Sequence, residues 1–163
     1  MTLCGVDSDI VPGSAYLAPY SMKERTCMAT ASAFIDIPVS AGQVWQLVGG
    51  FNSLPDWLPM IAKSEPGEGG RLRNLHTQNG DLIVERLQTF DNAAKTYSYS
   101  IVQSPFPVTD YLATLRVEAK GDGCRVTWSG LFTPQGVSDA MVQTLFEGVY
   151  RDGLAAMRAN FPA

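Results

Sequence analysis

The sequence predicts an α+β domain in which an antiparallel sheet wraps around one long C-terminal helix. Three observations lead to this prediction. Residues 138–161 carry a wide apolar face at helical spacing, formed by Met141, Val142, Leu145, Phe146, Val149, Tyr150, Leu154, Met157 and Phe161. Residues 60–132 instead alternate with a period of two between short turns, and residues 29–37 form a further apolar, β-branched run. A helix of this length spans roughly 35 Å at 1.5 Å per residue, so its apolar face needs a cover as broad as a curved sheet.

Length and composition favour one domain, which we place at residues 28–163. The 163 residues are 45% hydrophobic and 17% charged, enough apolar material for one core. Residues 1–27 show neither a helical nor a strand period. We expect them to form an extension that is either disordered or docked through Tyr16, Leu17 and Tyr20.

Charge and cysteine usage exclude several classes of protein. The net charge of -4 and the lack of a basic stripe argue against a nucleic acid partner. Cys4, Cys27 and Cys124 are widely spaced, and no apolar run is long enough for membrane insertion. The N-terminus lacks the basic and continuous apolar regions of a secretory signal. We therefore expect a reduced, cytoplasmic protein.

The first elements of the domain are a strand and a short helix. The strand at residues 29–37 should end at Pro38, which cannot donate a ladder hydrogen bond. Ser40 and Gln43 form a capping-box pattern, so a helix should begin there and end at Gly49.

A second short helical turn is expected at residues 53–58, stopped by Pro59. Six strands should follow as an antiparallel meander, because their connections have hairpin length. Asn79-Gly80 is the strongest turn signal among them. The strands are expected at residues 60–64, 71–77, 81–90, 95–102, 109–119 and 124–132, with a turn over residues 66–70.

Alternation assigns the faces of most strands. Trp128 shares a face with Val126, Gly130 and Phe132, so it should point toward the long helix. Tyr111 should also point inward. The strand at residues 81–90 stays undecided, because each of its faces would carry one charged residue.

No pattern predicts a metal or a cofactor. His76, the only histidine, alternates out of phase with its apolar neighbours, so we expect a solvent-facing role. Zinc sites need three or four Cys, His or carboxylate ligands, and no such spacing occurs. Nucleophile elbows, phosphate-binding glycine loops and dinucleotide fingerprints are likewise missing from the sequence.

An ordered set of motifs resembles a known family. The set runs through Val44-Trp45, Leu54-Pro55-Asp56-Trp57-Leu58-Pro59, Gly70-Arg71-Leu72-Arg73, Val84-Glu85-Arg86-Leu87, Tyr97-Ser98-Tyr99, Pro107-Val108-Thr109-Asp110-Tyr111 and Val126-Thr127-Trp128. It resembles the bacterial polyketide cyclase/dehydrase-like branch of the START or Bet v 1-like (SRPBCC) superfamily, which is related to the plant abscisic acid receptors. The resemblance covers residues 29–161. It implies the helix-grip fold, with seven antiparallel strands, two short helices after the first strand and an apolar cavity against the C-terminal helix.

The resemblance also implies a polar cluster inside that cavity. It turns Glu85 inward and places Arg73 and Tyr111 beside it. A carboxylate and a guanidinium persist in an apolar interior only when they are paired or completed by a ligand. A structural ion pair therefore explains these residues as well as a binding site does.

Two loops match the gates of the family's cavity, residues 78–81 and 104–108. Leu58 stands where many relatives have a histidine and the plant receptors a lysine, which puts recognition of a ligand carboxylate in doubt. The aromatic residues of the set can be core or cavity wall. On the C-terminal helix, the residues expected to form one wall of the cavity are Met141, Leu145, Phe146, Val149, Tyr150 and Leu154. The expected ligand-binding residues are Trp57, Leu58, Arg73, Leu75, Thr77, Ile83, Glu85, Tyr99, Ile101, Phe106, Val108, Tyr111, Ala113, Trp128, Phe146, Tyr150 and Leu154.

The leading functional hypothesis is binding of a small hydrophobic molecule that is aromatic, polyketide or lipid-like. The alternative is a metal-free cyclase or dehydratase with Glu85 as general base and Tyr111 or Arg73 polarising a carbonyl. A sensor that regulates a partner protein and a homodimer both stay open at this point.

Overall fold

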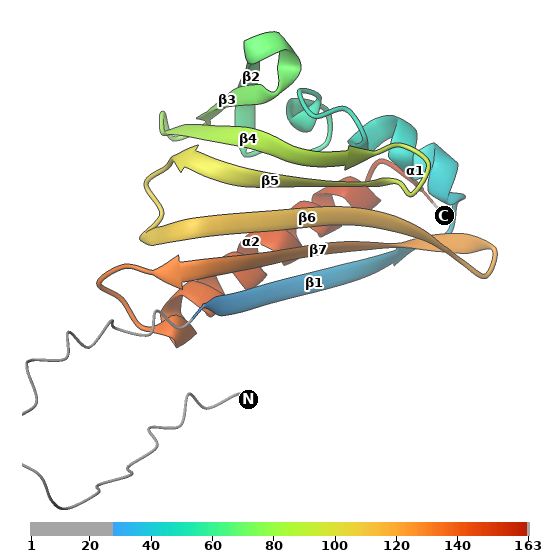
Figure 1. Cartoon of the computed structure of the whole chain (residues 1–163). Coiled ribbons are helices and arrows are strands. Elements are labelled where there is room, and N and C mark those ends of the chain that lie inside the picture. Colours follow the sequence, from blue (N-terminus) through green and yellow to red (C-terminus); the bar gives the residue numbers. More distant parts are fainter. Residues whose placement is uncertain (1–27, 163) are drawn as a thin grey trace, which may run out of the picture.

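The computed structural model describes residues 28–162 (Figure 1). They form one seven-stranded antiparallel sheet, two α-helices and two short 3-10 turns. The strands are β1 (Ala29–Ile37), β2 (Ile61–Gly67), β3 (Leu72–Thr77), β4 (Leu82–Asp91), β5 (Thr96–Gln103), β6 (Val108–Lys120) and β7 (Gly123–Pro134). The helices are α1 (Ala41–Val48) and α2 (Asp139–Arg158), and the 3-10 turns are η1 (Leu54–Asp56) and η2 (Glu68–Gly70). The predicted extension, with Tyr16, Leu17, Tyr20, Cys4 and Cys27, lies outside the described residues.

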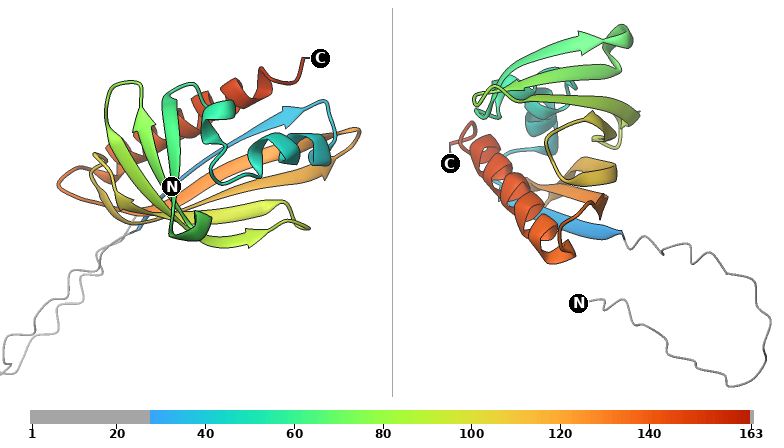
Figure 2. Two further views of the ribbon diagram at one scale, coloured as in Figure 1. Left: turned by 90° about the horizontal axis from the view of Figure 1, so that it is seen from above. Right: turned by 90° about the vertical axis from the view of Figure 1, so that its left-hand side faces the viewer.

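The sheet has the order β1-β7-β6-β5-β4-β3-β2, so β2 to β7 form a meander and β1 pairs with its last strand. The sheet curves around α2, which lies on its concave side (Figure 2). The C-terminal helix therefore has the broad cover that its apolar face requires. This arrangement confirms the predicted helix-grip fold.

Helix α1 begins and ends where the sequence predicts. The Ser40 hydroxyl accepts a hydrogen bond from the Gln43 amide at 3.3 Å, and the Ser40 amide donates to the Gln43 side chain at 3.2 Å. This capping box satisfies donors that a helix N-terminus leaves free. Gly49 follows the last turn, and a Cβ there would meet the Trp45 ring at 2.7 Å.

Helix α2 is capped by Ser138 and buries a narrower stripe than predicted. Met141 is 59% exposed and Leu145 is 38% exposed, so the prediction that they form a cavity wall is wrong. At 3.6 residues per turn, Leu145 is rotated about 100° from the buried Phe146. The buried residues are Val142, Phe146, Tyr150, Gly153, Leu154 and Met157. Within residues 28–162, no helix is both long and apolar enough to cross a membrane.

One local prediction fails, and one that the sequence left open is decided by the structure. The turn predicted over residues 66–70 is shorter, because Pro66 and Gly67 still pair with β3 and η2 makes the turn. In β4 the pairing with β5 shifts between Val84 and Glu85, and both residues are buried with Ile83. Ile83 and Glu85 both line the space in front of α2, whereas Val84 does not, so the structure decides the orientation that alternation left open.

Candidate functional site

A cavity lies between the concave face of the sheet and α2. Its volume is about 40 Å³, room for a few water molecules at roughly 10–15 Å³ each. Side chains therefore fill most of the space between sheet and helix. The lining residues are Leu54, Leu58, Met60, Ile61, Arg73, Leu75, Ile83, Glu85, Tyr99, Ile101, Phe106, Tyr111, Trp128, Phe146, Val149 and Tyr150.

Most of the residues that we expected at a ligand site line this cavity, but five do not. Trp57, Thr77, Val108, Ala113 and Leu154 lie elsewhere. The Thr77 hydroxyl accepts from the Asp81 amide at 3.0 Å and so closes the β3–β4 hairpin. Ala113 lies within the sheet, in register with a residue of β5 and one of β7, and is fully buried.

The sequence reasoning missed four lining residues. Leu54, Met60 and Ile61 precede or begin β2, and Val149 lies on α2. The predicted helical face already contained Val149, whereas no periodic signal marks the loop residues around Pro59. The loop before β2 thus contributes a side of the cavity that alternation cannot detect.

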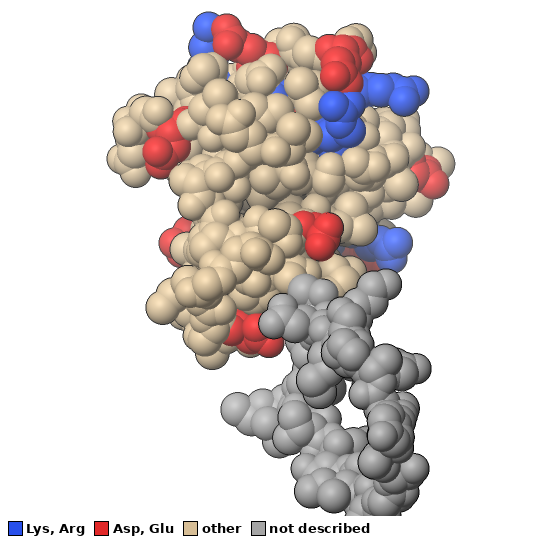
Figure 3. Space-filling model, turned by 60° about the vertical axis from the view of Figure 1, so that its left-hand side comes forward, with Lys and Arg blue, Asp and Glu red and all other residues tan. Residues whose placement is uncertain are grey.

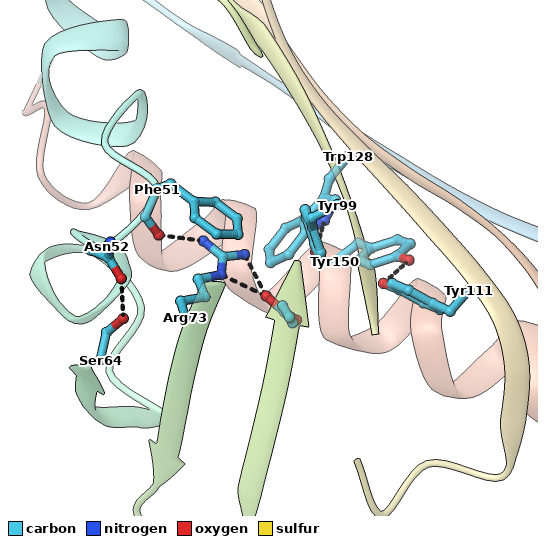
Figure 4. Close-up of polar contacts among 9 residues, drawn as sticks. Phe51, Asn52, Ser64, Arg73, Tyr99, Tyr111, Trp128 and Tyr150 are labelled. Carbon is cyan, nitrogen blue, oxygen red and sulfur yellow. Dashed lines mark hydrogen bonds and ion pairs between the residues drawn. The ribbon is translucent and has the colours of Figure 1, made fainter. Parts of the chain in front are cut away.

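Arg73 and Glu85 form a buried ion pair on the paired strands β3 and β4. The Arg73 Nε and Nη2 atoms both lie 2.6 Å from Glu85 Oε2, and Nη1 donates to the Phe51 carbonyl at 2.8 Å (Figure 4). The guanidinium carbon lies 4.2 Å from the Phe51 ring centroid and 4.7 Å from that of Tyr99. Cation–π contacts and the ion pair together compensate for burying the charge.

Burial and charge act in opposite directions on this pair. Burial raises the pKa of the Glu85 carboxyl above its ordinary value, although Arg73 offsets part of the rise. Burial also disfavours the charged form of Arg73, but Glu85 outweighs it and the pKa of Arg73 is raised. The guanidinium therefore stays charged.

The tyrosine hydroxyls form a second polar group, and this corrects the predicted cluster. Tyr111 does not contact Arg73 or Glu85 through a hydrogen bond; its hydroxyl lies 2.5 Å from the Tyr150 hydroxyl on α2. Trp128 Nε1 donates to the Tyr99 hydroxyl at 3.0 Å (Figure 4). Burial raises the pKa of Tyr99 and of Tyr111 well above the ordinary value, so both hydroxyls keep their protons.

Two backbone features position the tyrosine pair. Asp110 adopts a positive φ of 51° where the β6–β7 register shifts between Thr109 and Leu112. This bulge re-aims the strand just before Tyr111. On β7, a Cβ at Gly130 would lie 2.2 Å from the Tyr150 hydroxyl, so the glycine leaves room for that ring.

The rim of the cavity consists of apolar side chains that are only partly buried. Met60 is exposed, and Ile101, Phe106 and Val149 are half-buried. The Phe106 ring packs edge-on against Phe146 with centroids 5.1 Å apart. Of the two expected gate loops, residues 104–108 contribute Phe106, whereas residues 78–81 contribute no lining residue.

The end of the molecule that carries the β5–β6 loop has few charges. That end lies at the left of Figure 1 and comes forward in Figure 3, where most of the visible surface is uncharged and the acidic and basic side chains are scattered.

Three other residues were singled out by the sequence. His76 is partly exposed and lies 3.1 Å from the Glu65 carboxylate, as its phase predicts. Trp57 packs edge-on against Trp128, and its buried Nε1 has no hydrogen-bond partner among the described residues. Within residues 28–162, no cluster of three or more His, Cys, Asp or Glu side chains could hold a metal ion.

Known proteins resemble this chain over the whole domain. A family described as polyketide cyclase/dehydrase and lipid transport matches residues 28–162. The solved structure of XoxI from Bacillus cereus has 49% sequence identity and a TM-score of 0.79, covering 82% of this chain and 95% of that one. An uncharacterised protein from Bacillus thuringiensis has 47% identity and a TM-score of 0.79, covering 82% and 98%.

A more distant structure shares the fold alone. The di-domain ARO/CYC BexL has 21% identity and a TM-score of 0.70, with 80% of this chain and 45% of that one covered. No curated protein matches the chain.

Proposed function

This chain belongs to the polyketide cyclase/dehydrase and lipid transport family, and we propose that it binds a small hydrophobic molecule between the sheet and α2. The observation that carries the proposal is the cavity there. Its wall is mostly aliphatic and aromatic, and the polar groups of Glu85, Tyr99, Tyr111 and Tyr150 converge on it. An apolar pocket with a few convergent polar groups is typical of small-molecule sites.

The rim supports entry of a ligand larger than the cavity's 40 Å³. Met60 and Phe106 lie on loops rather than within the strand ladder. Their side chains can therefore move without breaking hydrogen bonds of the sheet. In this proposal the ligand displaces rim side chains and takes over their contacts with Phe146 and Val149.

Two tryptophan substitutions on α2 test the proposal. Val149→Trp fills the cavity, so it should abolish the rise in melting temperature that naphthalene causes in the parent protein. Leu145→Trp is the matched control, because Leu145 is exposed on the same helix and does not line the cavity. It should retain the full shift.

A ligand carried over from the expression host gives an independent readout. Native mass spectrometry should detect a bound small molecule in the parent protein and in Leu145→Trp, but not in Val149→Trp. Equal shifts in all three proteins, or no shift with any apolar probe, would contradict binding in this cavity.

Glu85 supports a second candidate, a cyclase or dehydratase in which its carboxylate is the general base. Burial raises the pKa of its carboxyl, which makes the carboxylate a stronger base than an exposed one. However, Arg73 already donates to Glu85 and Phe51, and Tyr111 is bonded to Tyr150. Arg73 or Tyr111 could therefore polarise a carbonyl only by giving up a buried contact. Binding without catalysis is for this reason the first candidate.

Turnover of an aromatic or polyketide-type carbonyl compound distinguishes the two candidates. An enzyme that uses Glu85 should lose most of its rate in Glu85→Gln. Turnover that persists at the parent rate in this variant would remove Glu85 from the mechanism.

A further inference from the structure

The Arg73 guanidinium is fully engaged within the protein. Nε donates to one carboxylate oxygen of Glu85, Nη2 forms an ion pair with the same oxygen, and Nη1 donates to the Phe51 carbonyl. Aromatic rings lie against the guanidinium, with the Phe51 centroid at 4.2 Å and the Tyr99 centroid at 4.7 Å. Arg73 is only 1% exposed. Its charge is thus already neutralised and its approaches are covered.

One carboxylate oxygen of Glu85 takes no part in the ion pair with Arg73. Both contacts from Arg73 reach Oε2, and Oε1 accepts no hydrogen bond from residues 28–162. Glu85 is 7% exposed and lines the cavity. Among residues 28–162, Trp57 Nε1 is the one fully enclosed side-chain polar atom without a partner, so Glu85 Oε1 stays open to the cavity and can accept a hydrogen bond from a molecule there.

Tyr99 supplies the complementary group. Its hydroxyl oxygen accepts from Trp128 Nε1, and within the described chain its own proton has no acceptor. Tyr99 also lines the cavity and stacks beside the Arg73 side chain of the ion pair. An unused donor and an unused acceptor therefore face the same small space.

We propose that this pair selects a neutral ligand with a hydroxyl group, an alcohol or a phenol, and rejects a carboxylate. The ligand hydroxyl donates to Glu85 Oε1 and accepts from the Tyr99 hydroxyl, so one group completes both hydrogen bonds. The inference rests on the proposed binding of a small hydrophobic molecule and adds the chemical class of its polar end.

A carboxylate ligand meets the opposite conditions. Arg73 and Glu85 together carry no net charge, and among residues 28–162 no other lysine, arginine or histidine lines the cavity. A ligand anion would be desolvated next to Glu85 without a cation to pair with, which is unfavourable in an apolar interior. Leu58, which also lines the cavity, adds only apolar surface.

A series of naphthalene probes at pH 7 tests the selection in the unmodified protein. 2-Naphthol has a donor and an acceptor, 2-methoxynaphthalene has only an acceptor, and naphthalene-2-carboxylate is charged. Calorimetric titration should show 2-naphthol binding at least tenfold more tightly than either of the other two. Plain naphthalene reports the binding of the apolar ring alone.

Glu85→Gln should reverse the preference. The variant removes the charge that neutralises Arg73, so naphthalene-2-carboxylate should gain at least tenfold in affinity while 2-naphthol loses affinity. Glu147→Gln makes the same chemical change at an exposed position of α2 and should leave the order of the probes unchanged. The probe series in the unmodified protein still decides the inference if Glu85→Gln does not fold.

The outcomes separate this inference from the proposed function. Failure of every probe to bind, naphthalene included, would overturn both. Equal affinity for 2-naphthol and 2-methoxynaphthalene would overturn the hydroxyl selection and leave binding of an apolar molecule intact. Tightest binding of the carboxylate by the unmodified protein would also overturn the selection.

Discussion

Arg73 and Glu85 stabilise the fold only as a pair, because either one alone would leave a charge in an apolar interior. Arg73→Leu strands the Glu85 carboxylate, so we expect the free energy of unfolding to fall by roughly 3 to 5 kcal/mol. Urea denaturation at pH 7 measures this change. Arg71→Leu, two residues earlier and exposed, is the matched control and should change stability little.

The double variant Arg73→Leu/Glu85→Leu sharpens the same prediction. Replacing both charges with apolar residues should recover much of the stability lost by Arg73→Leu, because no buried charge remains unpaired. A loss below about 1 kcal/mol in the single variant would mean that solvent compensates for the missing guanidinium.

Gly130 and the Tyr150 hydroxyl share a space that holds only one of them. The 2.2 Å contact that a Cβ would make requires the tyrosine ring to shift. We expect Gly130→Ala to cost about 1 to 3 kcal/mol of stability through overpacking. The loss should be smaller when Tyr150 is already phenylalanine, which a double-mutant cycle measures as coupling.

Gly148→Ala is the control for this substitution. A Cβ at Gly148 meets nothing closer than the Arg151 side chain at 3.8 Å. Within a helix this change should stabilise by about 0.5 to 1 kcal/mol. Additive effects of Gly130→Ala and Tyr150→Phe would show that the hydroxyl is not what the glycine accommodates.

At the scale of residues, the sequence predicts which way a strand side chain points but not which residue becomes its hydrogen-bond partner. Alternation along β6 and β7 correctly turns Tyr111 and Trp128 inward. The partner of Tyr111 is Tyr150, 39 positions away on α2. No local pattern indicates which residue so far along the chain will contact Tyr111. The family resemblance placed Tyr111 beside Glu85, but its hydroxyl forms its hydrogen bond with Tyr150 instead.

At the scale of elements, the sequence predicts helix caps and hairpin turns but not β-bulges. The capping box at Ser40 and the Asn79-Gly80 hairpin act through neighbouring backbone groups, so local residues determine them. The bulges in β4 depend on its pairing with β5. Their effect on Val84 and Glu85 becomes visible only when both strands are in place.

Asp36, near the C-terminal end of β1, links this strand to β6 and β7 through ion pairs. Asp36 accepts from Arg125 on β7 at 2.8 Å and from Lys120 on β6 at 3.1 Å. The Arg125 guanidinium is the main cause that lowers the pKa of Asp36 from 3.8 to about 2. The folded state therefore favours the ionised form, a contribution present above about pH 4 and lost as the pH falls toward 2.

Asp36→Asn removes this contribution. We expect its melting temperature to lie below that of the parent at pH 7, with the difference shrinking as the pH falls from 4 to 2. Thermal unfolding by circular dichroism measures both proteins over that range. A difference that stays constant with pH would indicate lost packing rather than lost charge.

At the scale of the whole molecule, the sequence predicts that the sheet wraps around α2, but it does not predict how much of the space between them the side chains fill. The long amphipathic helix and the meander suffice for a sheet wrapped around α2 (Figure 2). The residual volume depends on how the rings of Trp128, Phe146 and Tyr150 pack against one another, with Tyr150 stacked 5.0 Å from Trp128. Such packing is a tertiary property, so a cavity of about 40 Å³ could not be read from composition.

Phe106 is the rim residue whose removal should open this enclosure without disturbing the sheet. It is half-buried, and its ring contacts Phe146 from the β5–β6 loop. Phe106→Ala should cost roughly 1 to 2 kcal/mol through lost apolar burial. Naphthalene should nevertheless raise the melting temperature of this variant more than that of the parent, because it occupies the space that the ring vacates.

Phe34→Ala provides the matched control for that experiment. Phe34 lies on β1, is exposed, and packs against the Arg125 guanidinium of β7. It does not line the cavity, so its removal should not change the response to naphthalene. Since a ligand stabilises the folded state by RT ln(1 + [L]/Kd), a tenfold gain in affinity adds up to about 1.4 kcal/mol at saturating probe. Equal responses of the parent and both variants would show that the route to α2 does not pass Phe106, and would direct the search for the entrance to Met60.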